Sequence, residues 1–130
     1  MKTMKYLVDT HAFMWCFEGS DKLSKKAKNI ITDTSVLKYI SIASVWEFAI
    51  KHSMGKFPFE GGILHLYKLI EQFDFIILNI TQSHLNYVAE LPFIHRDPFD
   101  RLLIAVAKAE GMTILTADEN IHKYDVPSVW

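Results

Sequence analysis

The sequence predicts an α/β fold, namely a three-layer α/β/α sandwich around a central, mainly parallel sheet. Short apolar runs with strand character alternate with helical segments of roughly ten residues along the chain, and this alternation favours a parallel sheet with helices on both faces. No repeat, low-complexity tract or linker interrupts the alternation. We therefore expect residues 1–130 to form a single domain.

The individual elements follow from apolar periodicity and from helix start and stop signals. The run from Phe75 to Ile80 is apolar almost throughout, which is typical of a strand covered on both faces. Strands are expected at residues 5–9, 36–41, 75–80, 112–116 and 126–129, and helices at 11–17, 25–32, around 45–50, at 63–73, from 81 to just before 92, and from 98 to about 110.

Composition excludes several classes of protein. No apolar run approaches the roughly eighteen residues of a membrane span, and the N-terminus has no signal-peptide layout, so a cytoplasmic protein is expected. Cys16 is the only cysteine, which rules out a disulfide or a cysteine-based zinc site within one chain and favours an inert core thiol. The net charge of −1 argues against bulk coating of nucleic acid but leaves a nuclease possible.

The most informative stretch begins at His95 and continues through Gly111. Asp97 precedes Pro98, and an acidic cap followed by proline is a strong signal for a helix start. Asp100 lies in the first turn, where a carboxylate gains from the helix dipole, and Gly111 ends the apolar helix. The helix is therefore expected to be buried, with acids at its amino end.

Further acids occur at points that a parallel sheet would bring together. Asp9 ends the first strand, Asp118 follows the strand at residues 112–116, and Glu47 is an acid in a hydrophobic helical segment. Because ligands bind at the carboxyl edge of open parallel sheets, these side chains are expected near Asp100. Each acid also has a purely structural interpretation: a helix cap for the aspartates that precede helices, half of a capping box for Asp100, and an ion pair with Lys51 for Glu47.

Gathered carboxylates have a chemical consequence. Two such charges about 5 Å apart oppose each other by roughly 3 kcal/mol at an effective dielectric constant near 20. A hard divalent cation removes this cost, and all-oxygen ligands select Mg²⁺ or Mn²⁺ over zinc or copper. Such an ion can activate water and neutralise charge on a phosphodiester, as in metal-dependent nucleases.

The residues also resemble a known family. The segments 7–11, 44–47, 95–101 and 115–118 look like those of the PIN-domain ribonucleases, specifically the VapC-like toxins of bacterial toxin–antitoxin pairs. The resemblance covers essentially the whole chain, and the run from His95 to Arg101 is its most specific part. It implies a PIN-like fold, a Mg²⁺- or Mn²⁺-dependent endoribonuclease that hydrolyses RNA, a homodimer, and inhibition by a cognate antitoxin protein.

Carried over position by position, the resemblance assigns roles to seven residues. The family's acidic quartet, which would bind the metal and carry catalysis, corresponds to Asp9, Glu47, Asp100 and Asp118. Asp97 is expected to be an accessory acid. Thr116 and Arg101 are expected to support the site through hydrogen bonds.

Other functions compete with this interpretation. The main alternative is a non-catalytic α/β binding or signalling module with an acidic cation-binding pocket. A phospho-receiver would need an aspartate after its third strand and a lysine after its fifth, which this chain lacks, and a haloacid-dehalogenase phosphatase would need a second aspartate where His11 stands. An interaction module without turnover also remains open, and a metal-dependent cleavage assay separates it from an enzyme.

Overall fold

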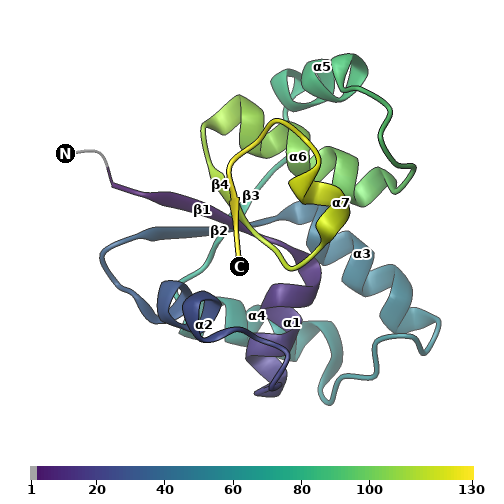
Figure 1. Ribbon diagram of the computed structural model, residues 1–130. Coiled ribbons are helices and arrows are strands. Elements are labelled where there is room, and N and C mark those ends of the chain that lie inside the picture. Colours follow the sequence, from purple (N-terminus) through teal and green to yellow (C-terminus); the bar gives the residue numbers. More distant parts are fainter. Residues whose placement is uncertain (1–2) are drawn as a thin grey trace.

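In the computed structural model, which describes residues 3–130, a five-stranded sheet lies between two layers of helices (Figure 1). The strands are β1 (Lys5–Val8), β2 (Leu37–Ser41), β3 (Ile76–Leu78), β4 (Thr113–Leu115) and β5 (Ser128–Val129). Their spatial order is β3-β2-β1-β4-β5, and every neighbouring pair is parallel. The predicted three-layer α/β/α architecture with a parallel sheet is confirmed.

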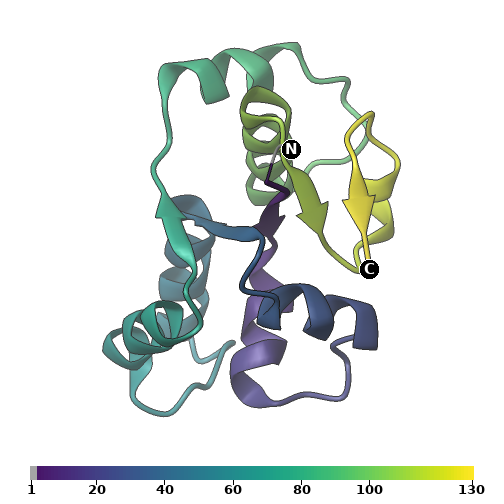
Figure 2. The ribbon, with the colours of Figure 1, turned by 90° about the vertical axis from the view of Figure 1, so that its left-hand side faces the viewer.

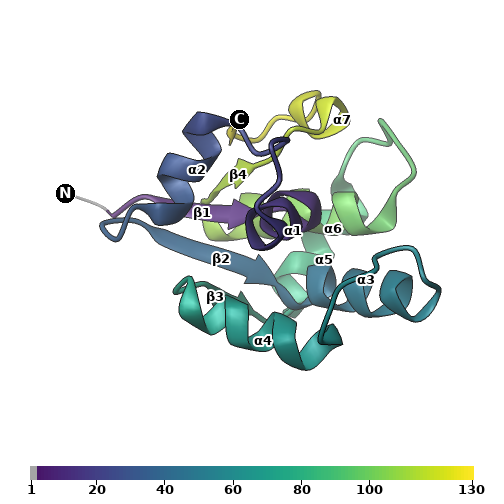
Figure 3. The same ribbon diagram turned by 90° about the horizontal axis from the view of Figure 1, so that it is seen from below.

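Seven helices connect the strands within the described residues. They are α1 (Thr10–Glu18), α2 (Lys25–Thr32), α3 (Ile42–Ser53), α4 (Gly62–Gln72), α5 (Gln82–Glu90), α6 (Pro98–Glu110) and α7 (Glu119–His122). Helices α1, α2 and α4 cover one face of the sheet, whereas α5 and α6 cover the other (Figures 1 and 2). Figure 3 shows the first of these layers from its outer side, with α3 beyond the carboxyl end of β2.

Alternation of side chains along the central strands divides the core into two clusters. Leu7 packs against α6 and α7, and its neighbour Val8 packs against the layer that contains α1, α2 and α4. Ile114 and Leu115 on β4 alternate in the same way, and all four residues are fully buried. A strand buried on both faces needs such an apolar pair at successive positions, which explains the short apolar runs of the sequence.

Two strands differ from expectation. Residues 75–80 were expected to be covered on both faces, but β3 is an edge strand and Ile76 is 42% exposed. The apolar run alone does not determine a strand's place in the sheet. The last strand is shorter than the expected 126–129, because Pro127 has no N–H to donate and pairing through hydrogen bonds to β4 begins with its carbonyl.

The expected helix signals operate as predicted where they matter for the site. Asp97 caps α6, with Pro98 as its first residue, and Gly111 ends the helix in the left-handed conformation at φ 66°.

Burial raises the pKa of the Cys16 thiol to about 11, which agrees with an inert thiol. Among residues 3–130, no helix has the length and apolar character needed to traverse a membrane.

Candidate functional site

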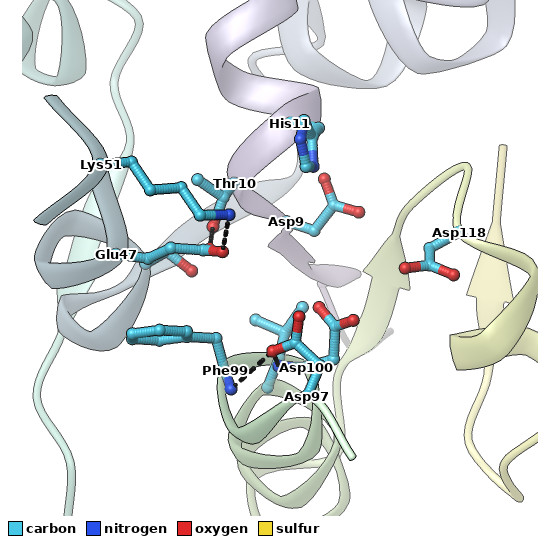
Figure 4. A pocket seen from close by; sticks show the side chains of 11 residues that line it. Asp9, Thr10, His11, Glu47, Lys51, Asp97, Phe99, Asp100 and Asp118 are labelled. Atoms are coloured by element: carbon cyan, nitrogen blue, oxygen red, sulfur yellow. Dashed lines mark hydrogen bonds and ion pairs between the residues drawn. The ribbon is translucent and has the colours of Figure 1, made fainter. Parts of the chain in front are cut away.

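A pocket of about 80 Å³ lies beyond the carboxyl ends of the central strands. It brings together all four acids of the expected quartet, from the N-caps of α1 and α7 and from α3 and α6 (Figure 4). Its lining residues are Asp9, Thr10, His11, Ser44, Glu47, Lys51, Asp97, Phe99, Asp100, Leu103 and Asp118. Residues up to 109 positions apart in the sequence thus meet where the parallel topology predicts a ligand site.

Asp9 follows β1 directly and caps α1. Its Oδ1 accepts a 2.7 Å hydrogen bond from the backbone N–H of Ala12, and the residue is only 7% exposed. Burial raises the pKa of the Asp9 carboxyl, and the Thr116 hydroxyl and the Ala12 N–H oppose that rise. The nearby Asp118 charge raises this pKa further. A positive ion beside Asp9 would favour the charged carboxylate.

Glu47 reaches the same pocket from α3 and is also buried. The Thr10 hydroxyl donates a 2.6 Å hydrogen bond to its Oε1, and Lys51 Nζ lies 2.9 Å from its Oε2. The expected ion pair with Lys51 is therefore present. Glu47 is nevertheless no ordinary surface glutamate, because it is 6% exposed and faces the aspartates across the pocket.

Asp97 and Asp100 stand at the amino end of α6. Asp97 Oδ1 accepts hydrogen bonds from the N–H groups of Phe99 and Asp100, at 2.9 and 3.2 Å. The Asp100 carboxylate is not engaged in a reciprocal capping box; its Oδ2 lies 3.3 Å from His95 Nε2. Burial, with the charges of Asp97 and the other pocket acids, raises the pKa of Asp100 to about 8.

Asp118 begins α7 on the far side of the pocket. Its carboxylate caps that helix by accepting a 2.8 Å hydrogen bond from Asn120 N–H, while its own N–H donates to the Thr116 hydroxyl at 3.0 Å. Thr116 is fully buried, and its hydroxyl contacts both the Asp9 carboxyl and the Asp118 N–H, so it supports two of the acids. Arg101 does not line the pocket; it donates to the Pro92 carbonyl and to the Tyr124 hydroxyl.

Three acids at the pocket rim therefore serve as helix N-caps, namely Asp9, Asp97 and Asp118. The capping interpretation and the site interpretation are compatible, because the recorded bonds engage Oδ1 of each side chain. A cap lies at the junction between a preceding segment and a helix. At the carboxyl edge of a parallel sheet, that junction opens onto the ligand site.

Sequence reasoning missed four contributors to this region. Lys51 and His11 line the pocket among the acids, as does Ser44, and His95 contacts Asp100 from behind. The spacing of Lys51 four residues after Glu47 was a usable signal for its place, whereas the contact of His95 with Asp100 depends on how the loop before α6 folds.

The donor set of the pocket fits a hard divalent cation. All four quartet side chains offer oxygen, the ligand type of Mg²⁺ and Mn²⁺. Burial raises the pKa values of Asp9 and Asp100, with a further rise from neighbouring acids, and a cation beside these carboxylates would favour their charged forms. Within residues 3–130, no three such side chains are already placed as a closed metal-binding group. Mg²⁺ tolerates that arrangement because it usually keeps several water ligands.

Comparisons with known proteins place the fold in a wider group. The VapBC2 complex of Rickettsia felis, bound to a DNA fragment from its promoter, contains a chain that matches with a TM-score of 0.74 at 17% identity over 98% of this chain and 99% of that one. VapBC-1 from nontypeable Haemophilus influenzae gives a TM-score of 0.72 at 14% identity, covering 97% of both chains. FitAcB from Neisseria gonorrhoeae gives 0.69 at 17% identity, covering 96% of both.

These identities are low, so the structural matches establish a shared fold. A comparison with curated proteins finds no match. The PIN domain family, in contrast, matches residues 6–127, which include all but the first residue of β1, the whole acidic pocket and the chain up to the start of β5. PIN domains are generally nucleases that use divalent metals. On this match, supported by the parallel sheet and the acidic pocket at its carboxyl edge, the chain belongs to the PIN-domain family.

Proposed function

We propose that this PIN domain is a Mg²⁺- or Mn²⁺-dependent endoribonuclease that acts as the toxin of a toxin–antitoxin pair. The observation that carries the proposal is the convergence of Asp9, Glu47, Asp100 and Asp118 on one pocket from four separate parts of the chain (Figure 4). Family membership supports nuclease chemistry, and the likeness to chains of VapBC and FitAcB structures supports the toxin role.

The proposed roles follow from the surroundings of each acid. Asp9 and Asp100, which face each other across the pocket and have raised pKa values, would hold the metal directly. When bound, Mg²⁺ supplies a polarising charge that activates water and neutralises the phosphodiester. Glu47 and Asp118 would bind through water or orient the attacking water.

The remaining residues of the pocket act on the acids or on the substrate. Lys51 carries the positive charge nearest to Glu47, and its position at the pocket wall suits a contact with an RNA phosphate. Asp97 adds negative charge beside Asp100 as an accessory acid. Thr116 fixes the backbone of Asp118 through the hydrogen bond from the Asp118 N–H.

Partners and location belong to the same proposal. The solved relatives are described as VapBC and as a toxin–antitoxin complex, the latter from Klebsiella pneumoniae. By analogy, this chain would bind a cognate antitoxin protein that blocks the acidic pocket. It would also form a homodimer and work in the cytoplasm, where its RNA substrate is found.

The decisive experiment measures cleavage of a fluorescent single-stranded RNA by the purified protein. Cleavage should require Mg²⁺ or Mn²⁺ and should stop in excess chelator. Asp9→Asn and Asp100→Asn should each abolish it while the unfolding transition is preserved, because asparagine keeps the size of both side chains and at position 9 still caps α1. Asp21→Asn, in the exposed loop between α1 and α2, is the matched control and should cleave at the wild-type rate.

Two results would contradict the proposal. Wild-type cleavage by Asp100→Asn at every Mg²⁺ concentration would remove Asp100 from the metal site. Absence of cleavage by wild-type protein with either metal and with a range of RNAs would favour the alternative, a non-catalytic module with an acidic cation-binding pocket.

A further inference from the structure

A chain of hydrogen bonds connects the acidic pocket to residues outside it. Arg101 Nη1 lies 3.2 Å from the hydroxyl oxygen of Tyr124, and that oxygen lies 2.9 Å from His95 Nδ1. On the other side of the imidazole ring, His95 Nε2 lies 3.3 Å from Asp100 Oδ2. The four residues come from the loop before α6, from α6 itself and from the segment after α7.

The groups around the Tyr124 oxygen determine which atoms donate. Arg101 Nη1 can only donate, and the backbone N–H of His95 also donates to this oxygen, at 3.3 Å. These two bonds occupy both acceptor positions of the phenolic oxygen. Its single hydrogen is then left for His95 Nδ1, which must accept.

This assignment determines the state of the His95 ring. If Nδ1 accepts, the ring hydrogen is on Nε2, so that Nε2 donates to Asp100 Oδ2. The opposite tautomer would place an N–H against a hydroxyl oxygen that already receives two donors, and Nε2 would present a lone pair to the ionised Asp100 carboxylate. A hydrogen bond to one ring nitrogen of a histidine commonly determines which tautomer the ring adopts.

We propose that His95 is a positioning residue that holds the Asp100 carboxylate toward the pocket, with its tautomer fixed by Tyr124 and Arg101. The inference rests on the proposed function, in which Asp100 binds the metal. The contact with His95 explains why the Asp100 carboxylate does not turn back toward the Asp97 N–H to form a capping box. It also gives Arg101 a role through Tyr124, although Arg101 does not line the pocket.

The surroundings of the chain keep it rigid. Tyr124 is 5% exposed and packs in the core cluster with α6, and its ring meets the His95 ring edge to face at 5.4 Å. Arg101 is held by the Pro92 carbonyl at 3.0 Å and lies over the Phe93 ring at 4.9 Å. A fixed support of this kind limits the rotamers open to a carboxylate at the first turn of a helix.

The first test reads the His95 tautomer directly, without metal or RNA. In ¹⁵N-labelled protein well above pH 8, where the Asp100 carboxyl is ionised, the ring nitrogen chemical shifts should report a protonated Nε2 and an unprotonated Nδ1. Tyr124→Phe should produce a mixture of tautomers, whereas Tyr87→Phe on the exposed face of α5 should leave the shifts unchanged. A wild-type ring protonated on Nδ1, or on both nitrogens, would overturn the proposal.

The second test measures binding of Mn²⁺ alone by titration calorimetry. His95→Leu should weaken binding by roughly tenfold, the lower end of the effects seen when a hydrogen-bond partner of a metal ligand is removed. His95→Gln, which keeps an N–H donor, should restore most of the affinity. Tyr124→Phe should weaken binding in the wild-type background and have no further effect in the His95→Leu background, because Tyr124 acts through His95. Equal effects of Tyr124→Phe in both backgrounds would contradict the proposal.

The two tests separate this inference from the proposed function. If wild-type protein bound no Mn²⁺ but showed the expected tautomer, the metal role of Asp100 would fail and the hydrogen-bond assignment would stand. If Mn²⁺ bound and RNA was cleaved while His95→Leu matched wild type in affinity, the proposed function would stand and the positioning role would fail.

Discussion

The Thr10 hydroxyl and the Glu47 carboxylate are joined by a 2.6 Å hydrogen bond between α1 and α3. Thr10 is the first residue of α1, directly after Asp9, so this bond couples the position of one pocket acid to that of another. Both residues are more than nine-tenths buried. The contact therefore serves the packing of two helices and the geometry of the acidic pocket together.

Replacement of Thr10 by valine should lower stability. The change keeps the shape of the side chain but leaves Glu47 Oε1 without its donor, and loss of a hydrogen bond to a charged, buried group costs about 2 kcal/mol. Urea unfolding measures the effect. Thr32→Val, at an exposed hydroxyl that bonds to the Lys28 carbonyl, is the control and should change the free energy of unfolding by less than about 0.5 kcal/mol. If Thr10→Val changed the free energy of unfolding as little as Thr32→Val, the Thr10–Glu47 bond would contribute nothing to stability.

Metal-free protein should lose stability as the pH rises from about 4 to about 8. The pKa of Asp100 is about 8 in the folded protein and about 3.9 in an unfolded chain. Between these values the folded state binds more protons than the unfolded state, so the free energy of unfolding falls with increasing pH. The contribution is complete below the unfolded pKa and lost above the folded one. Asp9, whose pKa is also raised, acts in the same direction.

Urea unfolding in chelator across this pH range provides the measurement. Asp100→Asn cannot ionise and should flatten the profile, and Mg²⁺ should restore stability to the wild-type protein most strongly near pH 8. Asp21→Asn is the control and should reproduce the wild-type slope. A wild-type profile as flat as that of Asp100→Asn would contradict the raised pKa of Asp100.

Two substitutions at Asp97 should separate its capping role from its charge. Asp97→Ala removes the cap of α6 and should cost about 1 kcal/mol of stability. Asp97→Ser keeps a capping oxygen and should stay near wild-type stability, yet it removes negative charge beside Asp100. Both variants should bind Mn²⁺ more weakly than wild type but better than Asp100→Asn, as titration calorimetry will show. Wild-type Mn²⁺ affinity in Asp97→Ser would limit Asp97 to capping.

Loss of the His84 side chain should destabilise the contact between α5 and α6. His84 is fully buried; its Nδ1 accepts from Thr81 N–H at 3.1 Å, and its Nε2 lies 2.8 Å from Glu110 Oε1. His84→Ala leaves a cavity and two broken hydrogen bonds, which together should cost about 2 to 4 kcal/mol. Thermal unfolding measures this loss of stability. Leu85→Ala, at the neighbouring residue that is 53% exposed, should lose much less stability in the same measurement. A similar loss in both variants would refute the special role of His84.

The fold was predictable because its signals are local. Asp9 and Asp118 follow strands, and parallel topology alone sends the ends of such strands to one edge. Asp97, Pro98 and Gly111 mark the limits of α6 by backbone chemistry that few other residues satisfy.

The rest of the site depends on tertiary packing. Nothing in the sequence pairs His95 with Tyr124, because the two are 29 residues apart and lie in irregular segments. The exposure of Ile76 likewise depends on the order of the strands, which apolar runs do not encode. The resemblance implies roles for the acids, and the structure adds which neighbouring side chains contact them.

The triple use of aspartate as a helix cap around the pocket affects how this chain can change by mutation. Asn, Ser and Thr cap helices nearly as well as Asp, so folding alone would let positions 9, 97 and 118 drift among these four residues. Conservation of aspartate at all three positions among homologues would therefore indicate selection for the negative charge. Homologues with Asn, Ser or Thr at these positions would still fold but would no longer be under selection for that charge.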